Sequence, residues 1–74
     1  MIRVHLSRLL GDRRISQIRL SEMTKVHVNT VNAMYNERLK RIDLGVLSRI
    51  CQALQCQPGD LLEFVSDENR RGDT

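Results

Sequence analysis

The 74-residue chain is poor in aromatic residues, proline, cysteine and long apolar runs. It has no Trp, and Tyr35 and Phe64 are its only aromatic residues, so we expect an aliphatic core. Apolar runs such as Leu61-Leu62 fall far short of the roughly 20 residues that a membrane span needs, and the N-terminus has no apolar signal segment. These absences predict a cytoplasmic protein that does not contact a membrane.

Cysteine and histidine are too few and too scattered to predict a metal site. Cys51 and Cys56 are five residues apart, and on a helix their side chains would point about 140° apart, which argues against a disulfide. Free cysteine usually packs as a small hydrophobe, so we expect both to be structural and at least half-buried. The sequence also has no Gly-rich phosphate loop, no nucleophile with a suitably spaced His and acid, and no carboxylate pair. We therefore expect no metal, no cofactor and no catalysis.

The net charge of +3 conceals an uneven distribution along the chain. Residues 1–42 carry nine basic and three acidic residues, giving +6, whereas residues 43–74 carry three basic and six acidic residues, giving −3. Such a division is typical of a chain whose first part faces a polyanion, although a solvated basic face would have the same composition. Charge alone therefore leaves nucleic-acid binding open.

The chain is long enough for one domain, which we predict over residues 1–65, followed by a polar, flexible tail over residues 66–74. No stretch alternates apolar and polar residues for long enough to predict a strand. Apolar spacing predicts five short helices instead, at about 2–13, 17–24, 28–36, 43–55 and 60–65. The predicted fold class is therefore all-α.

Cap residues and an apolar stripe support these helices. Ser16, His27 and Asp43 precede the second, third and fourth helices and can cap them, and Pro58 suits the first turn of the last. Leu44 is expected to join the apolar stripe of the fourth helix. The predicted core contains Leu20, Val26, Val31, Met34, Leu47, Ile50 and Leu54.

The second and third predicted helices are joined by a turn of three or four residues, which is the helix-turn-helix arrangement. The third helix carries the carboxamides of Asn29, Asn32 and Asn36, which no core requires. A helix with short polar side chains can enter the DNA major groove, which is about 12 Å wide. This pair of helices is therefore the candidate DNA-reading unit.

Specific residues along this unit and beyond it carry a family resemblance. They are Ser16-Gln17, Leu20-Ser21, Thr24, Val26, Asn29-Thr30-Val31 and Asn36, followed by Leu47, Ile50-Cys51, Ala53-Leu54 and the run from Cys56 to Leu62. With these residues the chain resembles the Cro and lambda-repressor-like (Xre-type) helix-turn-helix family over about residues 2–65. The resemblance implies a compact five-helix DNA-binding domain.

The chain departs from the family pattern at the turn and at the end of the third helix. Lys25 stands where the family usually has Gly, so its backbone is expected to be left-handed at a cost of about 1 kcal/mol. Ser21 replaces the usual Ala. The third helix ends in Tyr35-Asn36-Glu37 in place of an acidic residue followed by Gly, so the helix is expected to run on or turn differently.

The resemblance also implies residue roles at the DNA. Val28, Asn29, Asn32 and Ala33 would read bases, because Asn can pair with adenine while Val or Ala can touch a thymine methyl. Gln17 would contact a phosphate and steady the third helix. The remaining candidates for contacts to the DNA backbone are Arg14, Lys25, His27, Thr30, Asn36, Arg38, Lys40 and Arg41. For His27, capping the third helix is an equally good interpretation.

One short recognition helix covers only a few base pairs, so we expect a homodimer on a palindromic double-stranded operator. Leu61, Leu62, Phe64 and Val65 are the predicted interface, although they could instead close the monomer core. The family analogy and the absence of a separate activation or effector domain favour a transcriptional repressor. The alternative is an antitoxin-like or scaffold module that binds a protein partner, with DNA contact secondary; the small polar third helix favours DNA.

Overall fold

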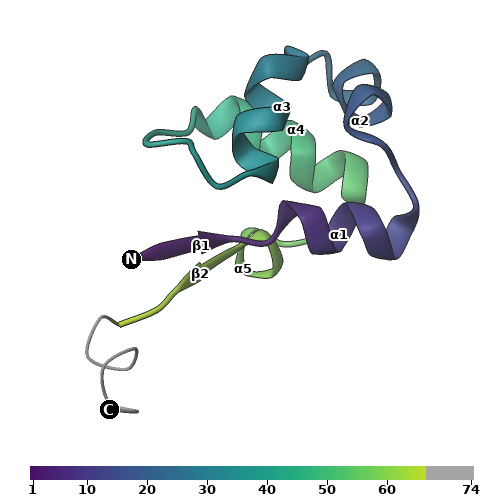
Figure 1. Cartoon of the computed structure of the whole chain (residues 1–74). Helices are drawn as coiled ribbons and strands as arrows, with labels where there is room; N and C mark the ends of the chain where they lie inside the picture. Colours follow the sequence, from purple (N-terminus) through teal and green to yellow (C-terminus); the bar gives the residue numbers. More distant parts are fainter. Residues whose placement is uncertain (67–74) are drawn as a thin grey trace.

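The computed structural model describes residues 1–66, which form several short helices and a two-stranded antiparallel ribbon (Figure 1). Within these residues the elements are β1 (Ile2–Val4), α1 (Leu6–Arg13), α2 (Gln17–Thr24), α3 (Val28–Tyr35), α4 (Leu44–Leu54), α5 (Pro58–Leu61) and β2 (Leu62–Phe64). Five helices are present in the described part, as predicted, but the ribbon makes all-α an approximate description. Residues 67–74 of the predicted tail lie outside the described residues.

The predicted caps set the starts of α2 and α4. Ser16 Oγ accepts the backbone N–H of Arg19 at 3.0 Å, and Asp43 Oδ1 accepts the backbone N–H of Gly45 at 2.7 Å. Each cap satisfies a backbone donor that has no partner within the first helical turn. Both cap predictions are confirmed, and α2 has the bounds that apolar spacing predicted.

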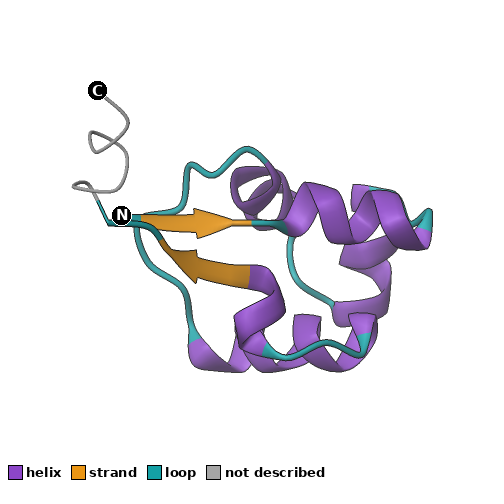
Figure 2. Ribbon diagram, turned by 90° about the horizontal axis from the view of Figure 1, so that it is seen from below, coloured by secondary structure: helices purple, strands orange, loops and turns teal. Residues whose placement is uncertain are grey.

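α1 begins at Leu6, so the expectation of a helix from residue 2 is wrong, as is the expectation of no strand. The first residues form β1, which pairs with β2 so that Ile2 lies opposite Phe64 (Figure 2). Ile2 also lies one helical turn before Leu6 in the sequence, which is the spacing that suggested a helix. Its true partner is at the far end of the chain, where local periodicity gives no signal.

α5 is shorter than predicted because the chain extends after Leu61. Pro58 occupies the first turn of α5, as predicted, and the Asp60 carboxylate accepts the backbone N–H of Gln57 at 2.9 Å. The residues that follow form β2, so the expected helix through Val65 is wrong. Pairing with β1 satisfies the backbone of these residues in place of a helical turn.

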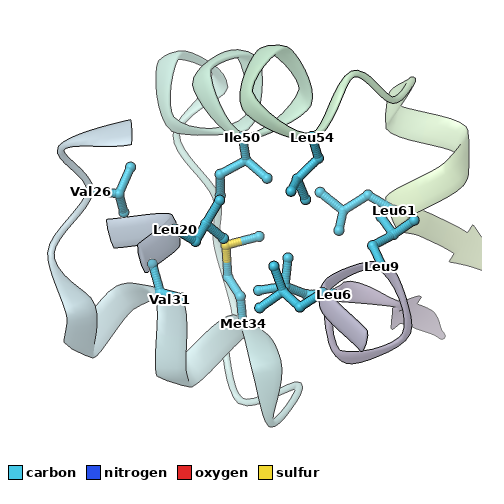
Figure 3. Packing of buried hydrophobic residues seen from close by; sticks show 10 residues of the cluster. Leu6, Leu9, Leu20, Val26, Val31, Met34, Ile50, Leu54 and Leu61 are labelled. Carbon is cyan, nitrogen blue, oxygen red and sulfur yellow. The ribbon is translucent and has the colours of Figure 1, made fainter. Parts of the chain in front are cut away.

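The core lies where α1, α2, α3, α4 and α5 meet (Figure 3). Its buried hydrophobic side chains are Leu6, Leu9, Leu10, Leu20, Val26, Val31, Met34, Ile50, Leu54 and Leu61. Leu47 was also predicted to be buried but is only half-buried. Leu44 is 77% exposed, so its expected place in the apolar stripe is wrong: it stands in the first turn of α4, where no element covers it.

The two cysteines are free and half-buried, as predicted. Their side chains do not diverge as expected, however, because α4 ends at Leu54 and Gln55 has a left-handed backbone with φ 50°. The reversal brings Cys56 back over the last turn of α4, and its N–H donates to the carbonyl of Cys51 at 3.0 Å. The two thiols are thus neighbours.

Candidate nucleic-acid interface

α2 and α3 are joined by residues 25–27, and α2 packs against both α3 and α4. Lys25 has φ 57° and ψ 26°, so the left-handed conformation expected there is confirmed. Val26 then points into the core, where its side chain is buried. A left-handed residue followed by an apolar anchor therefore sets the angle at which α3 leaves the turn.

Two hydroxyl groups fix the turn from inside. Ser21 Oγ donates to the carbonyl of Val26 at 2.6 Å. Buried Thr24 donates its hydroxyl to the Leu20 carbonyl at 2.7 Å and accepts the Val26 N–H at 3.3 Å. The turn thus keeps its buried polar groups paired although Lys25 replaces glycine. Sequence reasoning missed these roles; hydroxyl residues flanking a tight turn were the available signal.

His27 caps α3: its Nδ1 accepts the backbone N–H of Asn29 at 3.0 Å. This contact uses one ring nitrogen, and the side chain remains exposed. The cap interpretation is thereby supported, and among residues 1–66 the second ring nitrogen has no hydrogen-bond partner, so it could contact a phosphate. The two roles considered for His27 are therefore compatible.

The outer surface of α3 contains the predicted base-reading residues. Val28 is 36% exposed and Asn29 is exposed, whereas Asn32 and Ala33 are half-buried. Within the described residues, the Asn29 carboxamide has no hydrogen-bond partner. Small exposed side chains at the start of a helix allow its backbone to approach a DNA groove closely.

Asn32 is the centre of a hydrogen-bond network. Its Nδ2 donates to Gln17 Oε1 at 3.0 Å, and its Oδ1 accepts from an Arg38 guanidinium nitrogen at 2.7 Å. Its backbone carbonyl accepts from Asn36 Nδ2 at 3.0 Å. The network ties the first turn of α2 and the segment after α3 to the middle of α3. Four of the predicted DNA-contact residues are therefore brought together, with both atoms of the Asn32 carboxamide already engaged.

The other basic candidates are exposed but lie in separate places. Arg14 follows α1 and has a left-handed backbone with φ 55°. Lys25 lies in the turn before α3. Lys40 and Arg41 lie in the segment between α3 and α4, where they line a hollow beside β1 together with Val4. The structure thus groups Arg38 with α3. Within residues 1–66, the other basic candidates do not belong to the hydrogen-bond network of Asn32.

Glu37 forms a link that sequence reasoning missed. Its carboxylate accepts from Arg3 Nε at 2.8 Å, from the second Arg3 nitrogen at 3.0 Å and from the Val4 N–H at 3.0 Å. The bond to Arg3, followed by the bond to the Val4 N–H, lowers the pKa of Glu37 to about 2. Its backbone is left-handed, with φ 57°, at the position where the family usually has glycine. The end of α3 is therefore tied to β1.

The ribbon contains the residues predicted for a dimer interface, with one correction. Leu61 is 0% exposed and belongs to the monomer core, so it is not available to a partner. Leu62 and Val65 are half-buried, and Phe64 is 71% exposed. Phe64 faces Ile2 across the ribbon, and Ile2 is itself 56% exposed. An uncovered apolar pair thus lies at one end of the molecule.

Among residues 1–66, no three His, Cys, Asp or Glu side chains are close enough to hold a metal ion. No helix among the described elements is both long enough and apolar enough to cross a membrane.

Comparison with known proteins agrees with the geometry of the α2–α3 unit. Residues 5–67 match the model of the Cro/C1-type HTH DNA-binding domain. The chain is also 38% identical over 66 residues to a Bacillus subtilis (strain 168) protein named as an uncharacterized HTH-type transcriptional regulator, YozG. That match covers 89% of this chain and 79% of the relative. The family model thus describes a DNA-binding domain, and the relative is named as a transcriptional regulator.

Proposed function

Because the chain belongs to the Cro/C1-type family of helix-turn-helix DNA-binding domains, we propose that it is a sequence-specific transcriptional regulator that reads the major groove of double-stranded DNA with α3. The observation that carries the proposal is the outer surface of α3. Its exposed side chains are small or carry a carboxamide. The direction of the helix is fixed by the His27 cap and by the hydroxyl hydrogen bonds of Ser21 and Thr24 in the preceding turn. A preorganised helix of this kind can enter the groove without ordering a loop first.

Val28, Asn29 and Ala33 are the proposed base-reading residues, with Asn29 as the principal hydrogen-bonding group. Its carboxamide is exposed and can make the two hydrogen bonds that distinguish adenine. Asn32 was also predicted to read a base. Because its carboxamide is hydrogen-bonded to Gln17 and Arg38, we assign it mainly the role of positioning these two side chains. To contact a base, Asn32 would have to break one of these two hydrogen bonds.

The proposed contacts to the DNA backbone surround α3. Gln17, through its bond to Asn32, is positioned beside the recognition helix, and His27 stands at the N-terminus of that helix, where phosphates bind well. The other proposed backbone contacts are Arg14, Lys25, Thr30, Asn36, Arg38, Lys40 and Arg41. These groups would supply affinity for any sequence and set the register of α3.

A homodimer on a palindromic operator follows from the small size of α3. A recognition helix of 8 residues reads too few base pairs for genomic selectivity, and two half-sites one DNA turn apart solve this. Phe64, Leu62 and Val65 are the proposed interface, and we include Ile2 because it pairs with Phe64. A small dimer bound to such an operator would repress transcription.

The rival function is an antitoxin-like or scaffold module that binds a protein partner through α3. Protein interfaces are usually anchored by large aromatic or aliphatic side chains or by arginine. The exposed positions of α3 are instead Val28 and Asn29. This composition favours DNA over a protein partner.

Binding to DNA across a salt series tests the proposal. The protein would be titrated against its own promoter fragment and against a scrambled duplex of the same length and composition. We expect affinity for the promoter fragment to exceed that for the scrambled duplex about 10³-fold or more, and both affinities to fall as salt rises. Equal and weak binding to both duplexes would contradict specific recognition and would favour the protein-partner function.

A further inference from the structure

Cys51 and Cys56 come together at the end of α4 through a particular backbone geometry. Gln55 is left-handed, with φ 50° and ψ 53°, and the Cys56 N–H donates to the Cys51 carbonyl at 3.0 Å. This six-to-one hydrogen bond closes a Schellman motif, in which the side chains at these two positions pack on each other. The helix ending itself therefore brings the backbone of Cys56 back to Cys51.

The two thiols are close and accessible. Both side chains are free and half-buried, and the backbone reversal at Gln55 turns Cys56 back onto Cys51. They also share a surface hollow of about 710 Å³ that is open to solvent and is lined in addition by Leu44, Ser48 and Pro58. A small solute can therefore reach both sulfur atoms.

We propose that Cys51 and Cys56 are a redox-active dithiol, which a hydroperoxide closes to an intramolecular disulfide and a thiol reductant reopens. The Cys51 thiolate attacks a peroxide oxygen, the O–O bond breaks, and sulfenic acid and an alcohol or water form. Cys56 then attacks the sulfenic sulfur, so that the S–S bond forms and the hydroxyl leaves as water. The two thiols are oxidised by two electrons and the peroxide is reduced by two.

The order of attack follows from the surroundings of Cys56. Burial, and then the neighbouring Cys51 thiol, raise the pKa of Cys56. Less of this residue is therefore thiolate at neutral pH, which suits a resolving thiol better than the attacking one. Cys51 is accordingly assigned the first step.

The dithiol lies apart from the proposed DNA-reading residues. It joins α4 to α5, which leads directly into β2, whereas α2 and α3 contribute nothing to the shared hollow. Oxidation would therefore fix the connection to the ribbon. The inference is independent of DNA binding.

The test uses the reduced full chain treated with hydrogen peroxide, followed by iodoacetamide and intact-mass measurement. We expect the treated chain to lose two hydrogen atoms, to resist alkylation at both cysteines and to run as a monomer on a non-reducing gel. Dithiothreitol should restore both alkylation sites. Two alkylated cysteines after peroxide treatment, or a disulfide formed only between chains, would overturn the proposal.

Two single variants separate the roles of the thiols. Cys56→Ser should accumulate a sulfenic acid at Cys51 that dimedone traps, whereas Cys51→Ser should react with peroxide several-fold more slowly. Circular dichroism would check that each variant folds, and the wild-type mass measurement stands even if one does not. Equal dimedone labelling of the two variants would contradict the assigned order of attack.

Discussion

Individual residues after α2 and α3 hold the geometry of the proposed interface at a measurable cost in the free energy of unfolding. Lys25 and Glu37 both have left-handed backbones without being glycine. A side chain in this conformation costs about 1 kcal/mol. The structure therefore retains a strained residue at each end of α3.

Lys25→Gly should raise the free energy of unfolding by up to about 1 kcal/mol, because glycine adopts the left-handed conformation without strain. The measurement is urea unfolding. Lys25→Ala is the matched control: it removes the same charge but keeps the Cβ atom, so it should not share the gain. If the two variants are equally stable, backbone strain at Lys25 is not the cause.

Glu37→Gln should remove a pH-dependent part of stability. The pKa of Glu37 in the folded chain is about 2, below its ordinary value of 4.5. The stabilising bonds to Arg3 and the Val4 N–H are therefore fully present above about pH 4.5 and are lost as the pH falls toward 2. Unfolding curves should show a smaller loss of stability for the variant than for the wild type across this interval. Parallel curves would show that the link contributes nothing.

Some roles at this scale could be predicted from sequence and others could not. The caps at Ser16 and Asp43 depend on residues three positions away or fewer, so local patterns reveal them. The bond between Arg3 and Glu37 joins residues 34 positions apart and depends on the fold. The occupation of the Asn32 carboxamide by Gln17 and Arg38 was hidden for the same reason.

At the scale of elements, the α2–turn–α3 unit depends on hydroxyl groups as well as on apolar packing. Thr24 donates to the Leu20 carbonyl and accepts the Val26 N–H, and it is buried. A buried N–H without a partner costs about 1–3 kcal/mol. Thr24 is therefore expected to matter more for stability than its small size suggests.

Thr24→Val should lower the free energy of unfolding by about 1–3 kcal/mol, since valine keeps the shape but leaves the Val26 N–H unpaired. Thermal or urea unfolding measures the effect. Thr30→Val provides a control of identical chemistry at a half-buried position on α3. A loss of the same size in both variants would mean that the turn has no special dependence on Thr24.

The predictability of elements follows the range of the interactions that form them. α2, α3 and α4 show apolar spacing, and the caps tested at α2 and α4 lie where predicted, so their positions followed from sequence within about one residue. β1 and β2 are each 3 residues long, too short for alternation to be recognised. Each also continues apolar spacing from a neighbouring helix, so local periodicity predicts a helical turn at both.

At the scale of the whole molecule, the apolar pair at the end of the ribbon is the feature that the monomer leaves unexplained. Phe64 is 71% exposed and lies opposite Ile2. An exposed apolar pair of this kind is expected of a surface that a second copy covers.

Phe64→Ser should weaken self-association while leaving the monomer stable, because the side chain adds little to the monomer core. Sedimentation over a range of protein concentrations, with and without operator DNA, measures the mass. Leu44→Ser is the matched control, since Leu44 is 77% exposed but belongs to α4 and to neither strand of the ribbon. A wild-type mass that remains monomeric under all these conditions would contradict the dimer.

The central claim is that α3 reads bases through Asn29, and the most direct measurement is binding of wild type and variants to operators substituted at each base pair. Asn29→Ala should lose preference at one position, by about 1–3 kcal/mol, and keep it elsewhere. Lys40→Ala is the control, chosen over Arg38→Ala because Arg38 also holds Asn32; it should weaken all duplexes alike. If Asn29→Ala weakens every duplex equally, as a lost phosphate contact would, then Asn29 does not read the sequence and the account is contradicted.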